Sequence, residues 1–148
     1  MMATVKNLLL QKGKEVYSVQ AGSTIREALK LMGEKNIGAV LVMNGEKIVG
    51  IFSERDYARH AAQGASMLMD ESISEFMNRS VYYVSPKESV DQVMALMTSK
   101  RIRHLPVMEN EQLVGLISIG DVVKQILSDK ETTIAGLENY ILGRNYSG

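Results

Sequence analysis

Residues 48–56 read IVGIFSERD, and residues 113–121 read LVGLISIGD, with Gly50 and Gly115 in register 65 positions apart. The same shift relates Val16-Tyr17 to Val81-Tyr82 upstream. A repeat of this length indicates two copies of one supersecondary unit, and a unit this small cannot bury a core alone. We therefore expect the two copies to pack together, with the functional site between them.

The hydrophobic period changes in the same order within each copy. An apolar stripe at helical spacing is followed by two short apolar runs and then by a second amphipathic helix. Asn44-Gly45 is a strong signal for a two-residue turn between the apolar runs of the first copy. The predicted order is strand, helix, strand, strand, helix. After the first strand these segments are 25–32, 39–43, 47–52 and 57–62 in copy one, and 90–97, 105–108, 112–117 and 122–127 in copy two.

A short amphipathic lead precedes each copy, at residues 4–9 and 72–77. Copy one carries three extra residues after its lead, Gln11 to Gly13, which we place in a loop because insertions there cost little. Residues 132–142 have apolar positions at helical spacing and predict a terminal helix. The predicted domains are residues 1–62 for the first repeat with its lead helix, 63–71 for the linker, 72–128 for the second repeat, and 129–148 for the C-terminal helix and tail.

Composition excludes several classes of protein. The 148 residues suffice for a real core, and 17 Lys and Arg balance 17 Asp and Glu, so nothing favours nucleic acid or an anionic membrane as partner. The absence of cysteine removes thiolate catalysis and thiolate zinc sites, and the two histidines are unrelated by the repeat, so we predict no metal site. No apolar run approaches 18 residues, which favours a cytoplasmic protein. No catalytic motif is present, so we predict no catalytic residues and no enzyme.

Ser53 and Asp56 stand where a strand is predicted to enter a helix, and Ser118 and Asp121 stand at the equivalent place. A helix N-terminus offers unpaired N–H groups to a phosphate, and an Asp three residues later can accept hydrogen bonds from ribose hydroxyls. The same pattern is typical of a helix cap with an acidic residue in the first turn, which stabilises by about 1 kcal/mol without a ligand. The two roles can coexist, and the duplication favours ribose binding.

The two copies differ beside these aspartates. Arg55 stands in copy one where Gly120 stands in copy two. Arg55 can pair with a phosphate or with an acidic neighbour such as Glu54, and Gly120 either allows a ligand to approach the backbone or only relieves packing. The two candidate sites are therefore not chemically equivalent.

These features resemble the tandem cystathionine-β-synthase (CBS) domain pair over residues 4–128. The resemblance rests on the apolar strand before each first helix, on the run from Arg103 to Val107, and on the Gly-apolar-apolar-Ser-x-x-Asp segments that end at Asp56 and Asp121. It implies an α/β (α+β) fold of two β-α-β-β-α repeats with pseudo-twofold symmetry and clefts between them. It also implies a regulatory role through an adenosyl ligand such as AMP, ATP, NAD or S-adenosylmethionine.

By this resemblance Arg103 and His104 would reach a ligand anchored at Asp56, whereas Arg101 is read as solvated. Pro106 lacks an N–H and is expected at a strand end or edge, which leaves nearby backbone groups free to meet a base. The tyrosines that flank the first strands are equally typical of an interface or a half-buried core. The candidate ligand-binding residues are Tyr17, Ser18, Ser53, Arg55, Asp56, Tyr82, Tyr83, Arg103, His104, Leu105, Pro106, Ser118, Gly120 and Asp121.

The leading hypothesis is a regulatory module that binds AMP, ATP or an NAD-type nucleotide and passes a conformational change to an effector protein. Arg103 favours anionic ligands, and the apolar faces of residues 57–62 and 122–127 favour a homodimer. The alternative is a ligand-free dimerisation scaffold whose Ser-x-x-Asp segments act only as caps. A nucleotide-processing enzyme is disfavoured because a catalytic constellation is missing.

Overall fold

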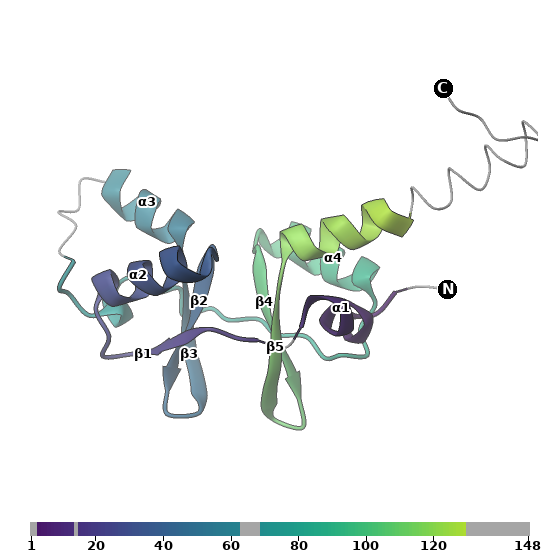
Figure 1. Ribbon diagram of the computed structural model, residues 1–148, viewed down its shortest axis with the longest axis horizontal. Coiled ribbons are helices and arrows are strands. Elements are labelled where there is room, and N and C mark those ends of the chain that lie inside the picture. The colour runs from purple at the N-terminus through teal and green to yellow at the C-terminus, as the bar shows by residue number, and fades with distance from the viewer. Residues whose placement is uncertain (1–2, 14, 63–68, 130–148) are drawn as a thin grey trace, which may run out of the picture. The chain divides into compact units, whose positions relative to one another are not determined.

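The structure, a computed structural model, describes residues 3–13, 15–62 and 69–129 (Figure 1). Most of the predicted linker and the terminal helix predicted at 132–142 lie outside these residues. The chain divides into two compact units, one formed by residues 15–82 and the other by residues 1–14 together with residues 83–148.

The unit of residues 15–82 is built on a three-stranded sheet in the order β1-β2-β3. β1 runs parallel to β2, and β2 pairs antiparallel with β3. Helix α2 begins where the Thr24 hydroxyl accepts the Glu27 N–H, and it packs Ile25, Ala28 and Met32 against the sheet. The elements are β1 (Ser18–Gln20), α2 (Ile25–Lys35), β2 (Ala39–Asn44), β3 (Lys47–Ser53), α3 (Glu54–Ala62) and the 3₁₀ helix η1 (Ile73–Glu75).

The second unit contains an antiparallel hairpin and the helices that cover it. Ser89 starts α4 with a capping box, in which Gln92 bonds back to the Ser89 N–H. Val84 pairs with Val107 in a single parallel bridge, which the 65-residue shift relates to the pair Val19 and Val42 of the first unit. The elements are α1 (Val5–Lys12), α4 (Val90–Lys100), β4 (His104–Glu109), β5 (Gln112–Ser118) and the helical residues 119–129.

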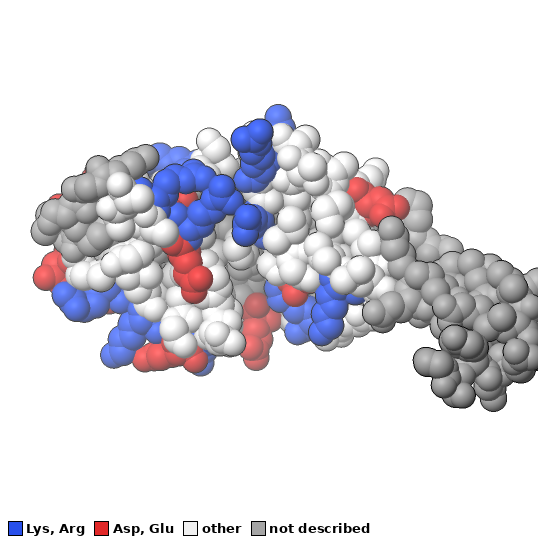
Figure 2. All heavy atoms as spheres, turned by 90° about the horizontal axis from the view of Figure 1, so that it is seen from above, with Lys and Arg blue, Asp and Glu red and all other residues white. Residues whose placement is uncertain are grey.

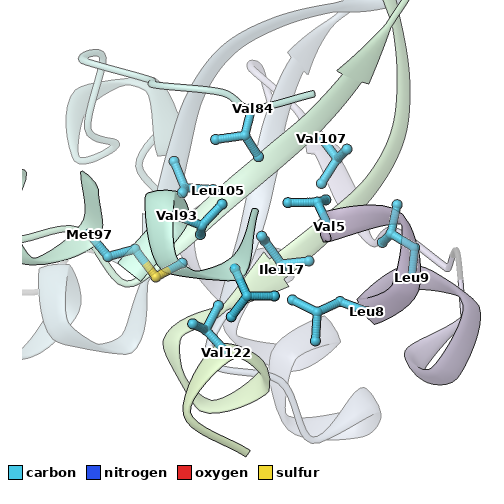
Figure 3. Packing of buried hydrophobic residues seen from close by; sticks show 11 residues of the cluster. Val5, Leu8, Leu9, Val84, Val93, Met97, Leu105, Val107, Ile117 and Val122 are labelled. Atoms are coloured by element: carbon cyan, nitrogen blue, oxygen red, sulfur yellow. The ribbon is translucent and has the colours of Figure 1, made fainter. Parts of the chain in front are cut away.

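The two lead segments are exchanged between the sequence repeats. Helix α1 precedes copy one but packs on the hairpin of copy two, where Val5, Leu8 and Leu9 join Val107 and Ile117 in one buried cluster (Figure 3). The lead of copy two packs in the same way on copy one, with Ile73 in that unit's core. The packing units therefore differ from the predicted domains, which kept α1 with the first repeat.

The repeated glycines make room for these leads. A Cβ on Gly115 would lie 2.5 Å from a methyl carbon of Leu9, and a Cβ on Gly50 would lie 2.8 Å from Cγ of Met77. Real Cβ atoms do not approach carbon this closely, so only glycine fits at either position without a shift. The glycine of the repeated motif thus has a packing role in both units.

Two local predictions were wrong. The first hairpin turns at Gly45-Glu46, one residue later than predicted, because Asn44 still pairs with Lys47. The insertion of copy one is also not all loop, since Gln11 and Lys12 extend helix α1 and only Gly13 follows it, with a φ of 98°. The extra residues thus lengthen a helix by half a turn.

Candidate ligand-binding site

The candidate residues of the first unit gather at one end of its sheet. Ser18 begins β1 and pairs with Leu41, and Ser53 ends β3 and pairs with Ala39 at the start of β2. The backbone carbonyl of Tyr17 accepts a hydrogen bond from the Leu41 N–H. Because α3 begins directly after Ser53, the end of the sheet and the start of this helix form a single corner.

Ser53 and Asp56 form a reciprocal cap at the start of α3. The Ser53 N–H and hydroxyl both donate to Oδ2 of Asp56 at 2.9 Å, and the Asp56 N–H donates back to the Ser53 hydroxyl oxygen at 3.2 Å. Among the described residues, the other carboxylate oxygen, Oδ1, accepts no hydrogen bond. The expected cap is therefore confirmed, and half of the carboxylate remains available to another donor. We call Ser53, Arg55 and Asp56 the Asp56 corner.

Ser118 and Asp121 repeat the two bonds that backbone N–H groups donate in this arrangement. The Ser118 N–H donates to Oδ2 of Asp121 at 2.8 Å, and the Asp121 N–H donates to the Ser118 hydroxyl oxygen at 3.2 Å. Here a third residue joins them, because the Lys12 ammonium lies 2.6 Å from the same Oδ2 and 2.6 Å from the backbone oxygen of Leu116. We call Lys12, Ser118, Gly120 and Asp121 the Asp121 corner.

The lysine changes the ionisation of Asp121. Burial alone would raise the pKa of this carboxyl, but the hydrogen bonds from the Lys12 ammonium and the Ser118 N–H outweigh burial, so its pKa is lowered from the ordinary value. The side chains of Lys12 and Asp121 are 33% and 26% exposed, so water and salt reach this ion pair only in part. Asp121 is therefore firmly ionised and already holds a cation.

The remaining candidates of the second unit lie at the equivalent end of its hairpin. His104 begins β4 and pairs with Ser118, and the Arg103 carbonyl accepts the Ile119 N–H. The Arg103 side chain is exposed, whereas the Leu105 side chain is completely buried in the core and leaves only its backbone for a ligand. The predicted reach of Arg103 to a ligand held at Asp56 joins residues of two units and stays a prediction.

Pro106 lies within β4, not at its end, and is buried. Its carbonyl accepts the Val84 N–H at 3.1 Å, so its missing N–H would face the same side, away from β5. The proline therefore breaks no bond of the β4-β5 hairpin, and the strand continues through it. β4 has no full strand on this side, but Val84 bridges to it there, so the expectation of an edge position holds only in part.

Arg55 and Gly120 start their helices in open surroundings. Arg55 is exposed and makes no ion pair within the part of the chain that the structure describes, so pairing with Glu54 is not observed. A Cβ on Gly120 would meet only the Ser118 hydroxyl oxygen, at an ordinary 3.5 Å. Relief of packing in its own unit therefore does not explain this glycine.

The three tyrosines have different surroundings. The Tyr17 hydroxyl donates to Glu15 at 2.8 Å, which raises the pKa of Tyr17, and the Lys35 ammonium lies 5.4 Å from its ring centre. Tyr82 and Tyr83 are 40% and 65% exposed. Tyr82 and Tyr83 are thus accessible, whereas Tyr17 is half-buried against the core and already has partners of its own.

Lys12 is the functional candidate that sequence reasoning missed. It stands 109 positions before Asp121 in the sequence and belongs to the insertion that only copy one carries. The insertion itself was the sequence signal that could have identified Lys12. Three extra residues in only one of two repeated leads indicate a local structure that the other copy does not have.

The charged residues of the surface are mixed in sign. Figure 2 shows basic and acidic side chains on the same face, in keeping with the balanced composition. No helix in the described ranges is long and apolar enough to cross a membrane. Within those ranges, no group of three His, Asp or Glu side chains is placed to hold a metal ion.

Comparison with known proteins gives consistent matches. Residues 8–63 and residues 73–128 each match the CBS domain. The mitochondrial CBS domain-containing protein CBSX3 of Arabidopsis thaliana is 31% identical over 149 residues, which cover 95% of this chain and 72% of that protein. The crystal structure of a CBS-domain containing protein from Agrobacterium tumefaciens is 40% identical with a TM-score of 0.79, and the match covers 83% of this chain and 98% of that one.

A further solved structure contains ligands. The CBS domain pair of protein MJ0100, in complex with 5′-methylthioadenosine and S-adenosyl-L-methionine, is 26% identical to this chain. Its TM-score is 0.76, and the match covers 87% of this chain and 99% of that one. The expected α/β fold of two repeats is thereby confirmed. Paired domains of this kind are regulatory modules, and some of them bind adenosine-containing ligands.

Proposed function

Because the chain belongs to the CBS domain family, we propose that it is a regulatory module that binds an adenine nucleotide of the AMP, ATP or NAD type. The observation that carries the proposal is the pair of Ser-x-x-Asp corners, each at the junction of a strand and a helix. At Asp56 the cap uses one carboxylate oxygen and leaves the other with no hydrogen bond among the described residues. An oxygen in this position suits a ribose hydroxyl.

The chemistry around the corners suits the rest of a nucleotide. The N–H groups of a helix start attract a phosphate, and the exposed guanidinium of Arg55 adds a cation at the Asp56 corner. The accessible rings of Tyr82, in one unit, and of Tyr83, in the other, each offer a face on which a base can stack. The ligands of MJ0100 share the adenosine group that these features would recognise.

The output of such a module is a change in shape or in affinity for a partner. A nucleotide drives that change only if it binds one conformation more tightly than another. Val123 and Leu127 are 38% and 54% exposed on helical residues 119–129, an apolar face that supports a homodimer or an effector contact. The lack of cysteine is in keeping with a reducing compartment such as the cytoplasm, and no catalytic role is proposed.

The test is a thermal-shift panel with AMP, ATP, NAD and S-adenosylmethionine, followed by calorimetry. A ligand at 100 times its dissociation constant adds about 2.7 kcal/mol to the free energy of unfolding. Asp56→Asn keeps an acceptor for the cap but removes the charge, so we expect binding to weaken at least tenfold with little loss of stability. Thr24→Ala, which removes the cap of α2 away from the corner, is the control and is expected to lower stability without changing affinity.

Arg103 is tested in the same way. Arg103→Met is expected to weaken AMP binding by about tenfold, the usual contribution of a charged hydrogen bond. Arg101→Met is the matched control, because Arg101 is an exposed residue at the end of α4 with a φ of 54° and is read as solvated. Equal effects of the two variants would show that only net charge matters.

The alternative is a scaffold that dimerises without a ligand. The reciprocal caps support it, because both Ser-Asp pairs have a structural role already. No binding of any panel member at millimolar concentration would favour the scaffold. Release of a chemically changed nucleotide would instead show an enzyme.

A further inference from the structure

The Asp121 corner contains a cation from outside its own sequence repeat, and the Asp56 corner does not. We propose that Lys12 sets the ligand specificity of the Asp121 corner, an inference that rests on the proposed function. The corner would bind ligands that carry a phosphate or another anionic group and would bind uncharged nucleosides less tightly. The two corners would then differ in how strongly they discriminate against uncharged nucleosides.

The position of the ammonium is set by packing, not by chance. Helix α1 is fixed by Val5, Leu8 and Leu9, which are all buried in the core of the second unit. Leu9 lies directly over Gly115, and the Lys12 ammonium bonds to the carbonyl of the next residue, Leu116. A lysine three residues after Leu9 lies one helical turn further along the same face. The packing of α1 on the core therefore positions the Lys12 side chain at the Asp121 corner.

An uncharged nucleoside meets a cost at this corner. Oδ2 of Asp121 already accepts the Lys12 ammonium and the Ser118 N–H, and only Oδ1 is left without a hydrogen bond among the described residues. A ribose that bonds to both carboxylate oxygens must therefore displace the ammonium from Oδ2 or share that oxygen with it. Displacement exchanges a charge-assisted hydrogen bond for a neutral one. A partly desolvated ammonium would also lose its partner, which makes the exchange less favourable.

A phosphate removes that cost. The ammonium can turn from Asp121 to the anionic group and keep a charged partner, while the carboxylate accepts the ribose. Space is present, because a Cβ on Gly120 would meet only the Ser118 hydroxyl oxygen at 3.5 Å. The corner thus combines the first turn of the helical residues 119–129, which carries the Asp121 carboxylate, with the Lys12 ammonium from α1.

The Asp56 corner has an exposed cation in Arg55, but among the described residues no cation is bonded to Asp56 itself. The competing donor on Oδ2 there is the Ser53 hydroxyl, which can rotate away without separating charges. The lead that packs on this unit passes from Met77 to Asn78 with no counterpart of the Gln11–Gly13 insertion. The difference between the corners is therefore built into the sequence of the leads.

The experiment compares AMP with adenosine by calorimetry, in an Asp56→Asn background that isolates the Asp121 corner. We expect the background protein to prefer AMP, and we expect Lys12→Met to reduce the ratio of AMP affinity to adenosine affinity by about tenfold. Lys12→Arg keeps the charge and is expected to keep the preference. Lys6→Met is the matched control, since Lys6 is an exposed lysine of the same helix, and it is expected to leave the ratio within about twofold.

The outcomes separate the two proposals. An unchanged ratio in Lys12→Met, with AMP still bound, overturns the role of Lys12 and leaves the nucleotide-binding function in place. Equal weakening of AMP and adenosine overturns it as well, because it shows a structural role alone. If the unmutated protein binds neither compound at millimolar concentration, the proposed function fails and the role of Lys12 fails with it.

Discussion

The two copies share their side-chain pattern but differ in how far the first strand pairs. In copy one, β1 pairs with β2 at three positions, and the Leu41 N–H donates to the Tyr17 carbonyl. In copy two the equivalent of Leu41 is Pro106, and only the bridge between Val84 and Val107 remains. Pro106 lacks the N–H that Leu41 donates, and the ladder is shorter here while its register is kept. A duplicated sequence thus preserves a fold while its backbone pairing diverges.

The corners diverge through a different mechanism. Each aspartate exchanges two hydrogen bonds through backbone N–H groups with the serine three positions before it, yet only Asp121 meets a lysine from an exchanged lead. The residues within the motif preserve the local geometry, and a residue far away in the sequence sets the charge. Equivalent positions in a repeat therefore need not form equivalent sites.

The largest effect is expected from placing a proline in copy one. Leu41→Pro removes the N–H that bonds to Tyr17 and leaves part of a fully buried side chain's volume empty. We expect a loss of about 3 kcal/mol or more in the free energy of unfolding, measured by chemical denaturation. Leu41→Val keeps the N–H and should cost about 1 kcal/mol. Equal losses would show that the hydrogen bond is irrelevant and that only volume matters.

The repeated glycines offer a second comparison of the two units. Gly50→Ala is expected to destabilise by about 1–3 kcal/mol, because the new Cβ would meet Met77 and also the backbone oxygen of Asn78 at 3.1 Å. That oxygen is held by the Ile51 N–H and cannot move alone. Gly115→Ala should cost less, since its close contacts are all with the Leu9 side chain. Denaturation curves of the two variants give the order directly, and the reverse order would contradict it.

Much of this fold follows from local sequence signals. Helical spacing, two-residue turns and the order of elements depend on residues near one another, so both hairpins and the helices α2 and α4 were predictable. The Ser53-Asp56 cap is local in the same sense, since its members are three positions apart. The repeat does not indicate which of the two sheets each lead packs on. An amphipathic segment can cover either sheet equally well.

Lys12 was unpredictable for that reason. Its contact with Asp121 exists only because α1 crosses to the other repeat, a choice made by the packing of Leu9 on Gly115. The same packing turned a predicted loop into the end of a helix. For Pro106 the sequence predicted the chemistry, a missing N–H, but not the position. Pro106 fits inside β4 because its missing N–H faces the side on which Val84 pairs and not β5.

A smaller effect is expected from the acid dependence of the Lys12–Asp121 pair. The pKa of Asp121 is lowered in the folded protein, so the pair stabilises the fold above the unfolded value, about 3.9, and this stabilisation is lost as pH falls through the folded value. Lys12→Met should therefore be less stable than the unmutated protein near neutral pH by up to about 1 kcal/mol. The difference should vanish once pH lies below the folded pKa of Asp121.

Denaturation of both proteins between pH 2 and about pH 7 measures this difference. For Lys6→Met, on the same helix, the difference in free energy of unfolding from the unmutated protein should stay constant over that range. A constant offset for Lys12→Met would mean that its methylene groups stabilise the fold and its charge does not.

The smallest effect is expected from restoring the missing N–H in copy two. Pro106→Leu gives β4 the residue that copy one has at this place, and the new N–H points to the side on which Val84 pairs. We expect the amide that this substitution introduces to be protected from hydrogen exchange, with a change in stability below about 1 kcal/mol. Pro106→Ala restores the same N–H without the larger side chain, so the alanine amide should be protected too. Protection in both variants would show that the proline alone shortened the ladder, whereas rapid exchange in both would place the cause in residues 81–83 and not in β4.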